Sequence, residues 1–312
     1  MTDNVTADRD RALGFALIDR HARGRLVRLG PTLDAVLAAH AYPPVVERLL
    51  AEALTVTALL GAMLKDDNGQ LTLQAQTENG VVDLLVCDYR GGELRGYLKF
   101  DADRLAEMPA DPSLFALFGK GYLAITFDQS ASNERYQGIV PLEGASLAAA
   151  VEHYFDQSEQ IPSLVRIAIS GGAGRPCVAG GMLLQHLPEG EVGRDRLHTR
   201  LDHPEWRHVE TLAATVKAEE LTDCDLPLET LVWRLFHDEG EVRLLGGAAI
   251  SKGCRCNPEH IRSVLSRFPE DERAAMADDL GLVHVDCEFC SRSFPIALES
   301  LAVPGDAPPY AH

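Results

Sequence analysis

The sequence predicts an α/β chain of mixed α+β type in three parts. These are an N-terminal domain with antiparallel sheets (residues 1–186), a helical linker (187–250) and a small C-terminal domain (251–312). Three observations support this prediction. Apolar runs separated by glycine turns fill the first part, two amphipathic segments follow in a proline-punctuated stretch, and four cysteines gather near the C-terminal end.

The composition is that of an ordinary folded protein, with 312 residues, 46% hydrophobic and 24% charged. A net charge of −18 disfavours nucleic-acid binding, which needs a basic face. The polar start Met1–Asp10 does not resemble a signal peptide, and the longest apolar run, Ala53–Leu64, is too short to span a bilayer. We therefore expect a cytoplasmic protein with no nucleic-acid and no membrane partner.

The first domain combines two helices with short strands. Pro44 suits the first turn of a helix over Pro44–Leu64, which has a broad apolar face, and a second helix is expected over Ala145–Gln157. Turn pairs such as Asn79-Gly80 and Gly91-Gly92 favour antiparallel hairpins. The expected strands are Ala12–Asp19, Gly24–Leu29, Leu71–Gln76, Val81–Tyr89, Glu93–Phe100, Tyr122–Phe127 and Leu164–Ile169.

Two amphipathic helices are predicted in the linker, and they begin at Pro204 and Pro227. Their apolar positions are Trp206, Val209, Leu212, Ala213 and Val216 in the first and Leu228, Leu231, Val232, Leu235 and Phe236 in the second. Both apolar faces need a surface to pack on. The helices are either an ordinary hairpin packed on the main domain or a docked linker that can be released. The stretch Gly246–Ala249 that follows is expected to be flexible.

The cysteine spacing indicates a metal site. Cys254 and Cys256 form a Cys-x-Cys pair, and Cys287 and Cys290 form a Cys-x-x-Cys pair thirty residues further on. Four thiolates complete the tetrahedral shell that Zn²⁺ prefers. A Cys-x-Cys pair can also close as a strained, labile disulfide. Spacing alone therefore leaves open a purely structural zinc site and a redox switch.

A helix is expected from Asn257-Pro258 to Phe268, and a second one from Pro269 towards Gly281. No combination of nucleophile, base and orienting group stands out in the sequence, so we expect no enzyme activity. A thiol-disulfide oxidoreductase would need Cys287 at a helix start, whereas Ser291–Pro295 is a poor beginning for a helix.

Several segments together resemble the redox-regulated 33 kDa chaperonin family of bacteria. The paired cysteines and their long spacer are one part of the resemblance. The others occur in family order and are Gly119-Lys120-Gly121-Tyr122-Leu123, Glu134-Arg135-Tyr136-Gln137-Gly138, Tyr154-Phe155 with Ser158-Glu159-Gln160, Gly180-Gly181-Met182-Leu183-Leu184-Gln185 and Trp233-Arg234-Leu235-Phe236-His237.

The resemblance implies an ATP-independent holdase, a chaperone that binds unfolding proteins and prevents their aggregation under oxidative and heat stress. It implies a reduced, inactive form with one Zn²⁺ per chain on the four cysteines, and an oxidised, active form with two disulfides. Because near neighbours in sequence meet most often, we expect the bridges Cys254–Cys256 and Cys287–Cys290.

The expected partners are unfolded or oxidatively damaged client proteins, with a possible homodimer on oxidation. The residues expected to contact clients belong to the linker and are Trp206, Val209, Leu212, Leu231, Leu235 and Phe236. The alternative is an interaction protein with a purely structural zinc site.

Overall fold

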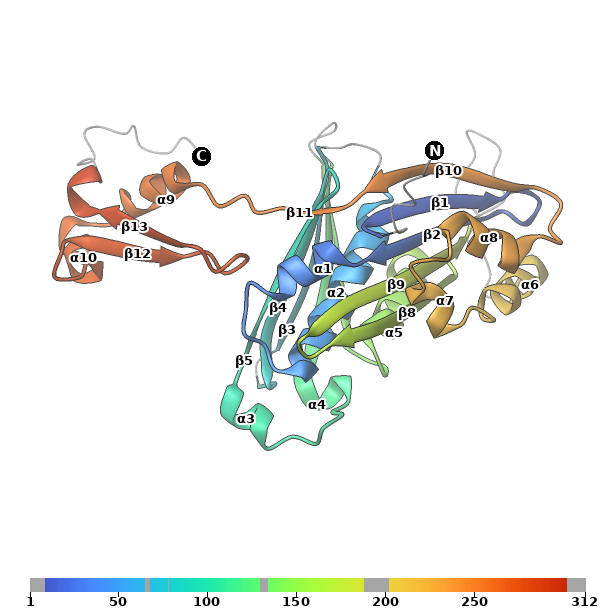
Figure 1. The fold of residues 1–312 in the computed structure, drawn as a ribbon, viewed down its shortest axis with the longest axis horizontal. Coiled ribbons are helices and arrows are strands. Elements are labelled where there is room, and N and C mark those ends of the chain that lie inside the picture. The colour runs from blue at the N-terminus through green and yellow to red at the C-terminus, as the bar shows by residue number, and fades with distance from the viewer. Residues whose placement is uncertain (1–8, 65–67, 78, 130–133, 188–201, 302–312) are drawn as a thin grey trace. The chain divides into compact units, whose positions relative to one another are not determined.

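The computed structural model describes residues 9–64, 68–77, 79–129, 134–187 and 202–301 (Figure 1). The chain divides into two compact units, Met1–Gly253 and Cys254–His312. The architecture is mixed α/β with antiparallel sheets, as the sequence predicted. The finer limits 1–186, 187–250 and 251–312 stay a prediction.

A five-stranded antiparallel sheet forms one layer of the first unit (Figure 1). Its strands, in spatial order, are β10 (Val242–Ala249), β1 (Arg11–Leu17), β2 (Ala22–Leu29), β9 (Arg175–His186) and β8 (Ser163–Gly172). A 3₁₀ turn at Ile18–Arg20 joins β1 to β2, where His21 takes a positive φ of 47°. The strands β10 and β8 are the two edges of this sheet.

A six-stranded sheet forms the second layer. Its order is β11 (Ser251–Lys252), β5 (Glu93–Phe100), β4 (Val82–Arg90), β3 (Gln70–Thr77), β6 (Gly121–Gln129) and β7 (Glu134–Pro141). All of its pairings are antiparallel except that of β11 with β5. Its inner residues, such as Leu73, Leu85 and Ile125, alternate with outward polar ones and belong to the main core.

The helix α2 (Pro44–Gly61) contacts strands of both sheets and is buried along most of its length. It begins at a proline, which suits the first helical turn. Its leucines, alanines and valines fill the space between the layers, so that one large core joins the two sheets. The helices α1 (Pro31–Leu37), α3 (Ala102–Ala106), α4 (Leu114–Phe118) and α5 (Leu147–Tyr154), with a π-helical turn at Phe155–Glu159, complete this part.

Three further helices cover the other face of the five-stranded sheet: α6 (Pro204–Ala213), α7 (Ala218–Thr222) and α8 (Leu228–Phe236). The helices α6 and α8 begin at or next to the prolines that the sequence singled out, whereas α7, which the sequence analysis did not predict, begins after Lys217. The outward residues of the sheet, including Phe15, Leu26 and Met182, form a second core with these helices. The sheet is therefore buried on both faces.

The stretch Gly246–Ala249 was expected to be flexible, and this expectation was wrong. It forms the end of β10, which pairs with β1 from Arg11↔Ala249 to Leu17↔Val242, with a bulge opposite Leu13 and Gly14 that skips Gly246. Its side chains are almost all exposed. Backbone pairing rather than burial therefore holds this strand.

The second unit is small. It contains α9 (Pro258–Leu265), α10 (Glu270–Met276), the hairpin β12 (Leu282–Asp286) and β13 (Ser293–Ala297), and a 3₁₀ turn at Leu298–Ser300. Asn257 caps α9 by accepting the amide of Glu259 at 2.8 Å. The helices end earlier than expected, at Leu265 and Met276. The buried apolar residues described in this unit are Leu265, Val283, Phe294, Ile296 and Leu301.

Candidate metal centre and docked linker

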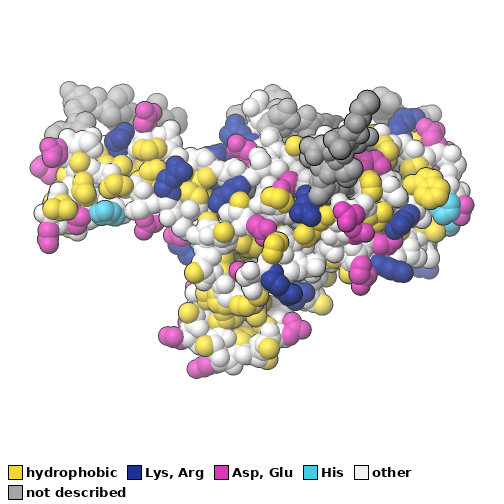
Figure 2. Space-filling model, in the orientation of Figure 1, with side chains coloured by type: hydrophobic (Ala, Val, Ile, Leu, Met, Phe, Trp, Pro, Cys, Tyr) yellow, Lys and Arg dark blue, Asp and Glu magenta, His cyan; other side chains and the backbone are white. Residues whose placement is uncertain are grey.

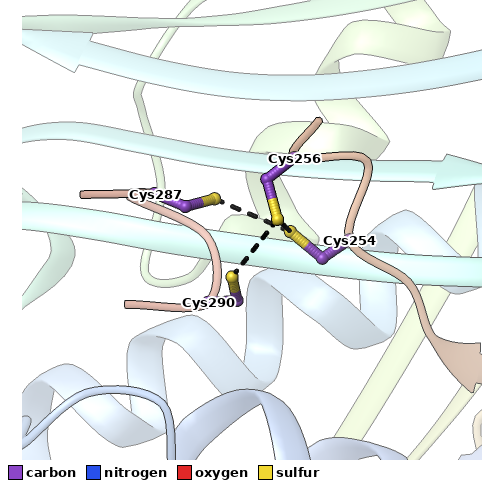
Figure 3. A group of neighbouring side chains, drawn as sticks. All are labelled: Cys254, Cys256, Cys287 and Cys290. Atoms are coloured by element: carbon purple, nitrogen blue, oxygen red, sulfur yellow. Dashed lines mark hydrogen bonds between the residues drawn. The ribbon is translucent and has the colours of Figure 1, made fainter. Parts of the chain in front are cut away.

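The four predicted cysteines converge in the second unit (Figure 3). Their sulfurs all lie within 4.8 Å of one another. The Sγ atom of Cys254 is 3.2 Å from that of Cys256 and 3.6 Å from that of Cys287. The sulfurs of Cys256 and Cys290 are 3.7 Å apart. Two segments far apart in sequence thus contribute two thiols each to one cluster.

These distances fit a tetrahedral metal. With Zn–S bonds of about 2.3 Å, the sulfurs of a regular tetrahedron are about 3.8 Å apart. The observed separations of 3.2, 3.6 and 3.7 Å are close to that value. They are far longer than a disulfide bond of about 2.05 Å, and all four cysteines are free thiols. The four thiols could therefore hold one metal ion in a tetrahedral shell.

Local backbone geometry places the second pair. The amides of Cys290 and Ser291 both donate to the carbonyl of Cys287, at 3.2 and 2.8 Å, and Ser291 takes a positive φ of 54°. This tight turn follows β12 and points the thiols of Cys287 and Cys290 to one side. The side chains of Cys256 and Cys287 also pack on the small apolar cluster of the unit.

The electrostatics of the cluster favour a cation. Burial, together with hydrogen bonds to Cys254 and Cys290, raises the pKa of the Cys256 thiol to about 12. Thiols this close cannot all ionise near neutral pH unless a positive charge lies beside them. A divalent metal supplies that charge and makes the ionised form of each thiol favourable.

The remaining cysteines are in different surroundings. Burial raises the pKa of Cys87 far above its ordinary value and that of Cys177 to about 11. The thiol of Cys224 is partly buried and lies 3.6 Å from the carbonyl oxygen of Thr222. Within the described ranges, none of the three shares a metal-ligating cluster with other side chains. Low thiolate content makes Cys87 and Cys177 poor targets for oxidants.

The linker helices are docked with their apolar faces inward. Trp206, Val209, Leu231 and Phe236 are almost wholly buried, and Leu235 is 9% exposed. Leu212 is partly buried at the edge of the same cluster. Phe236 packs on Phe15 of β1 with ring centroids 5.5 Å apart. Among the large side chains of these helices, Trp233 by contrast is 63% exposed.

A buried arginine binds the backbone of α7 and the turn after it. Arg28 of β2 is fully buried. Its Nε donates to the carbonyl of Leu221 at 2.9 Å, and its two terminal nitrogens donate to the carbonyls of Leu226 (2.6 Å) and Glu220 (3.0 Å). Gly180 of β9 allows this close approach, because a Cβ there would lie 2.0 Å from the Leu221 carbonyl oxygen.

Ion pairs border the same interface. Arg20 pairs with Glu205 of α6 and with Glu239, the latter at 2.6 Å, and the other oxygen of Glu239 lies 2.6 Å from Nε2 of His208. Burial would raise the pKa of Glu239, but the hydrogen bonds from Arg20 and His208 outweigh it and lower the pKa on balance. Arg11 of β1 pairs with Glu229 of α8 at 2.5 Å.

Arg28 and Gly180 were not recognised from the sequence as docking residues. A signal for Arg28 was present. It lies two positions after Leu26, and alternate strand residues share a face, so its position marks it as facing the linker. Nothing in the sequence indicated which carbonyls it would meet.

The chain combines a mixed α/β domain, docked helices and a four-thiol unit. Comparisons with known proteins find this combination in a class of molecular chaperones. The family described as Hsp33 protein matches residues 10–297, and the chain belongs to this family. The 33 kDa chaperonin of Caulobacter vibrioides is 39% identical over 294 residues, covering 92% of this chain and 94% of the relative.

The 33 kDa chaperonin of Yersinia pestis is 37% identical over 288 residues, covering 92% of both chains. The crystal structure of the 33 kDa chaperonin, heat shock protein 33 homolog, of Thermotoga maritima has the same fold. Its TM-score is 0.75 at 22% identity, and the match covers 94% of this chain and 96% of that one. No helix among the described residues is both long and apolar enough to cross a membrane.

Proposed function

We propose that this chain is an ATP-independent holdase switched on by oxidation of Cys254, Cys256, Cys287 and Cys290. The observation that supports the proposal most strongly is the four-thiol cluster in a unit with very little apolar core. The chain runs from the docked linker through β10 and β11 directly into this unit. Loss of order in the unit would therefore act first on β11 and β10, the strands that join it to α8.

In the reduced state, the four cysteines would hold one Zn²⁺ per chain. When bound, such a metal contributes ~10–16 kcal/mol of apparent folding free energy in small zinc peptides. The five buried apolar side chains that the structure describes in this unit, up to Leu301, supply far too little to replace it. The second unit should therefore be folded only while its thiols remain ligands.

The oxidation step balances with peroxide as the oxidant. Cys254 and Cys256 form one S–S bond and lose two electrons, and Cys287 and Cys290 form the other in the same way. Each disulfide consumes one hydrogen peroxide, which accepts two electrons and two protons and leaves as two waters. The four thiolate ligands are then gone, and the metal no longer has a site.

The surface offered to clients would come from the linker and the sheet beneath it. Unfolding of the second unit would allow α6, α7 and α8 to leave the sheet and expose Trp206, Val209, Leu212, Leu231, Leu235 and Phe236. The partners would be unfolded or oxidatively damaged proteins in the cytoplasm. The oxidised form would also associate as a homodimer, which a comparison of the molecular mass of the two forms in solution tests. Acidic and basic side chains are interspersed on the visible face in Figure 2, and the net charge of −18 favours solubility while apolar surface is exposed.

A test compares the reduced, zinc-loaded protein with the peroxide-treated protein from one sample. We expect the treated protein to lose zinc and to keep a thermally unfolding client in solution without ATP. Thiol reductant with zinc should reverse both changes. Equal holdase activity in the two forms would reject the redox switch. It would favour the second candidate function, an interaction protein whose zinc is purely structural. The close packing of the linker helices on the sheet is compatible with this second candidate.

A further inference from the structure

A single buried side chain anchors the segment between the linker helices and the second unit. No residue from His237 to Ala249 is buried, and β10 is held by backbone pairing with β1. Ile250, the next residue, is 3% exposed and belongs to the main core between the two sheets. The two residues after it are exposed, and Gly253 has no side chain. Within the described stretch 237–253, Ile250 is therefore the one side chain that is buried.

Hydrogen bonds fix the backbone of Ile250 on both sides. Its amide donates to the carbonyl of Asp10 at 2.7 Å, and its carbonyl accepts from the hydroxyl of Thr32 at 3.3 Å. The carboxylate of Asp10 in turn accepts the amides of Gly30 at 2.9 Å and Thr32 at 3.0 Å, at the start of α1. The two partners of Ile250 are thus bound to each other as well, which keeps its position rigid.

The chain crosses from the five-stranded to the six-stranded sheet at this residue, because β10 precedes it and β11 follows it (Figure 1). Two amides, of Ser251 and of the residue two positions later, donate to the carbonyls of Gly92 at 2.9 Å and Leu94 at 3.0 Å. The Nζ of Lys252 donates to the carbonyl of Ala35 in α1 at 2.6 Å. Ser251 and Lys252 are exposed, so these bonds add less than the burial of Ile250.

Loss of order in the second unit removes none of these contacts directly. That unit begins at Cys254, whereas Ile250 and the partners named above all belong to the first unit. A disordered chain would then begin just after Gly253. It would reach the exposed pairing of β11 first, and the buried side chain of Ile250 would remain between it and β10. Separation of β10 from β1 therefore requires that an isoleucine leave a packed core, which is unfavourable.

We propose that Ile250 is the residue that couples the second unit to the linker. While its side chain stays in the main core, β10 and α8 remain docked even after the second unit has lost order, and they are released once it has left. This role rests on the proposed function and adds the residue that regulates it. The burial of Ile250 then sets the fraction of oxidised chains whose linker is free, because the docked and released forms are in equilibrium.

The test measures hydrogen exchange in the full-length protein, reduced and zinc-loaded, and again after peroxide. In the oxidised wild type, we expect the amides of β12 to lose protection before those of Ile250 and β10. Ile250→Ala should accelerate exchange in β10 by roughly 30-fold or more, as a large-to-small change in a core does. Exchange in β12 and the rate of zinc release should be unchanged, because Ile250 and the four cysteines lie in different units.

Three further variants separate this role from a merely structural one. Ile125→Ala is the matched control, since Ile125 of β6 is fully buried in the same core but lies in the middle of the six-stranded sheet. It should lower global stability and leave the ratio of β10 to β12 exchange unchanged. Ile250→Val should restore most of the slow opening of β10. Thr32→Val keeps the side-chain shape, removes the hydroxyl that donates to Ile250, and should accelerate β10 exchange by about two- to tenfold. Thermal unfolding confirms that each variant is folded.

Loss of protection in β10 and β12 at the same rate in the oxidised wild type would overturn the proposal. So would equal β10 exchange in the wild type and in both Ile250→Ala and Thr32→Val, or an equal selective acceleration in Ile125→Ala. The proposed function fails in a different way, if peroxide leaves β12 protected or gives no holdase activity. The reduced proteins then decide the role of Ile250 alone, because Ile250→Ala should still accelerate exchange at Ser251 and at the Ala249 end of β10.

Discussion

Replacing Arg28 by methionine should loosen the linker without any oxidant. The change keeps most of the side-chain volume and removes all three hydrogen bonds to the backbone of α7 and the turn after it. The bonds to the Leu221 and Leu226 carbonyls are fully buried, and the third, to Glu220, is partly buried. At ~1.5–3 kcal/mol for each hydrogen bond to a charged group, the two buried bonds account for about 3–6 kcal/mol.

A loss of this size shifts the equilibrium between docked and released linker by roughly 10²- to 10⁴-fold, at about 1.4 kcal/mol per tenfold change. We therefore expect amide exchange in α7 to accelerate by about that factor in the reduced, zinc-loaded variant. Part of the holdase activity should appear before peroxide is added. Zinc content should stay at the wild-type value, because Arg28 and the cysteines lie in different units.

The matched control is Arg95→Met. Arg95 also lies on a strand and also binds a buried partner, since its Nε and a terminal nitrogen donate to Asp88 at 2.8 and 2.6 Å. It belongs to the six-stranded sheet, which does not carry the linker. Its loss should lower global stability and leave the relative protection of α7 unchanged. Equal α7 exchange in the wild type and in Arg28→Met would refute the reasoning.

Three further predictions concern the cysteines and the ion pairs. We expect elemental analysis to find one zinc per chain in the reduced wild type and none in the double variant Cys254→Ser, Cys256→Ser. Full retention of zinc in the variant would reject the ligand set. Peptide mapping after peroxide should find the bridges Cys254–Cys256 and Cys287–Cys290, and a dominant Cys256–Cys287 bridge would contradict this. Because the pKa of Glu239 is lowered from its ordinary 4.5, its contribution to docking is present above that pH and is lost as the pH falls through the lowered value. Hydrogen exchange of α6 should therefore increase in acid below about pH 4.5, and Glu239→Gln should exchange faster at neutral pH with a flatter acid response.

The linker helices and α2 could be predicted because each carries its own signals. Pro44, Pro204 and Pro227 lie at helix starts, and the apolar residues after them repeat at helical spacing. The four-thiol cluster could be predicted for a related reason. Each pair is local in sequence, so only one long-range contact between the pairs had to be inferred.

The strands β9 and β10 were harder to predict because their glycines weaken the local strand pattern, and the reason for these glycines lies in residues far away in the sequence. Gly180 and Gly181 weaken the strand pattern of β9, yet a Cβ at Gly180 would meet the Leu221 carbonyl and one at Gly181 would meet Thr55 and Leu59 of α2. In β10, Gly246 and Gly247 lack side chains to bury, and pairing with β1 determines the structure. Such long-range partners leave no local pattern.

The attachment of β10 has a mechanical consequence. Its side chains are exposed, so the pairing with β1 is its main attachment, and the end of the strand at Ala249 is the one nearer to Cys254 in the chain. A strand lifted from one end separates one residue pair at a time, whereas a strand sheared along its axis must break all its bonds together. Once β11 has separated from β5 and Ile250 has left the core, β10 would be free at Ala249 and could separate from β1 one pair at a time towards Val242. Little force is needed at each step, and α8 is reached last.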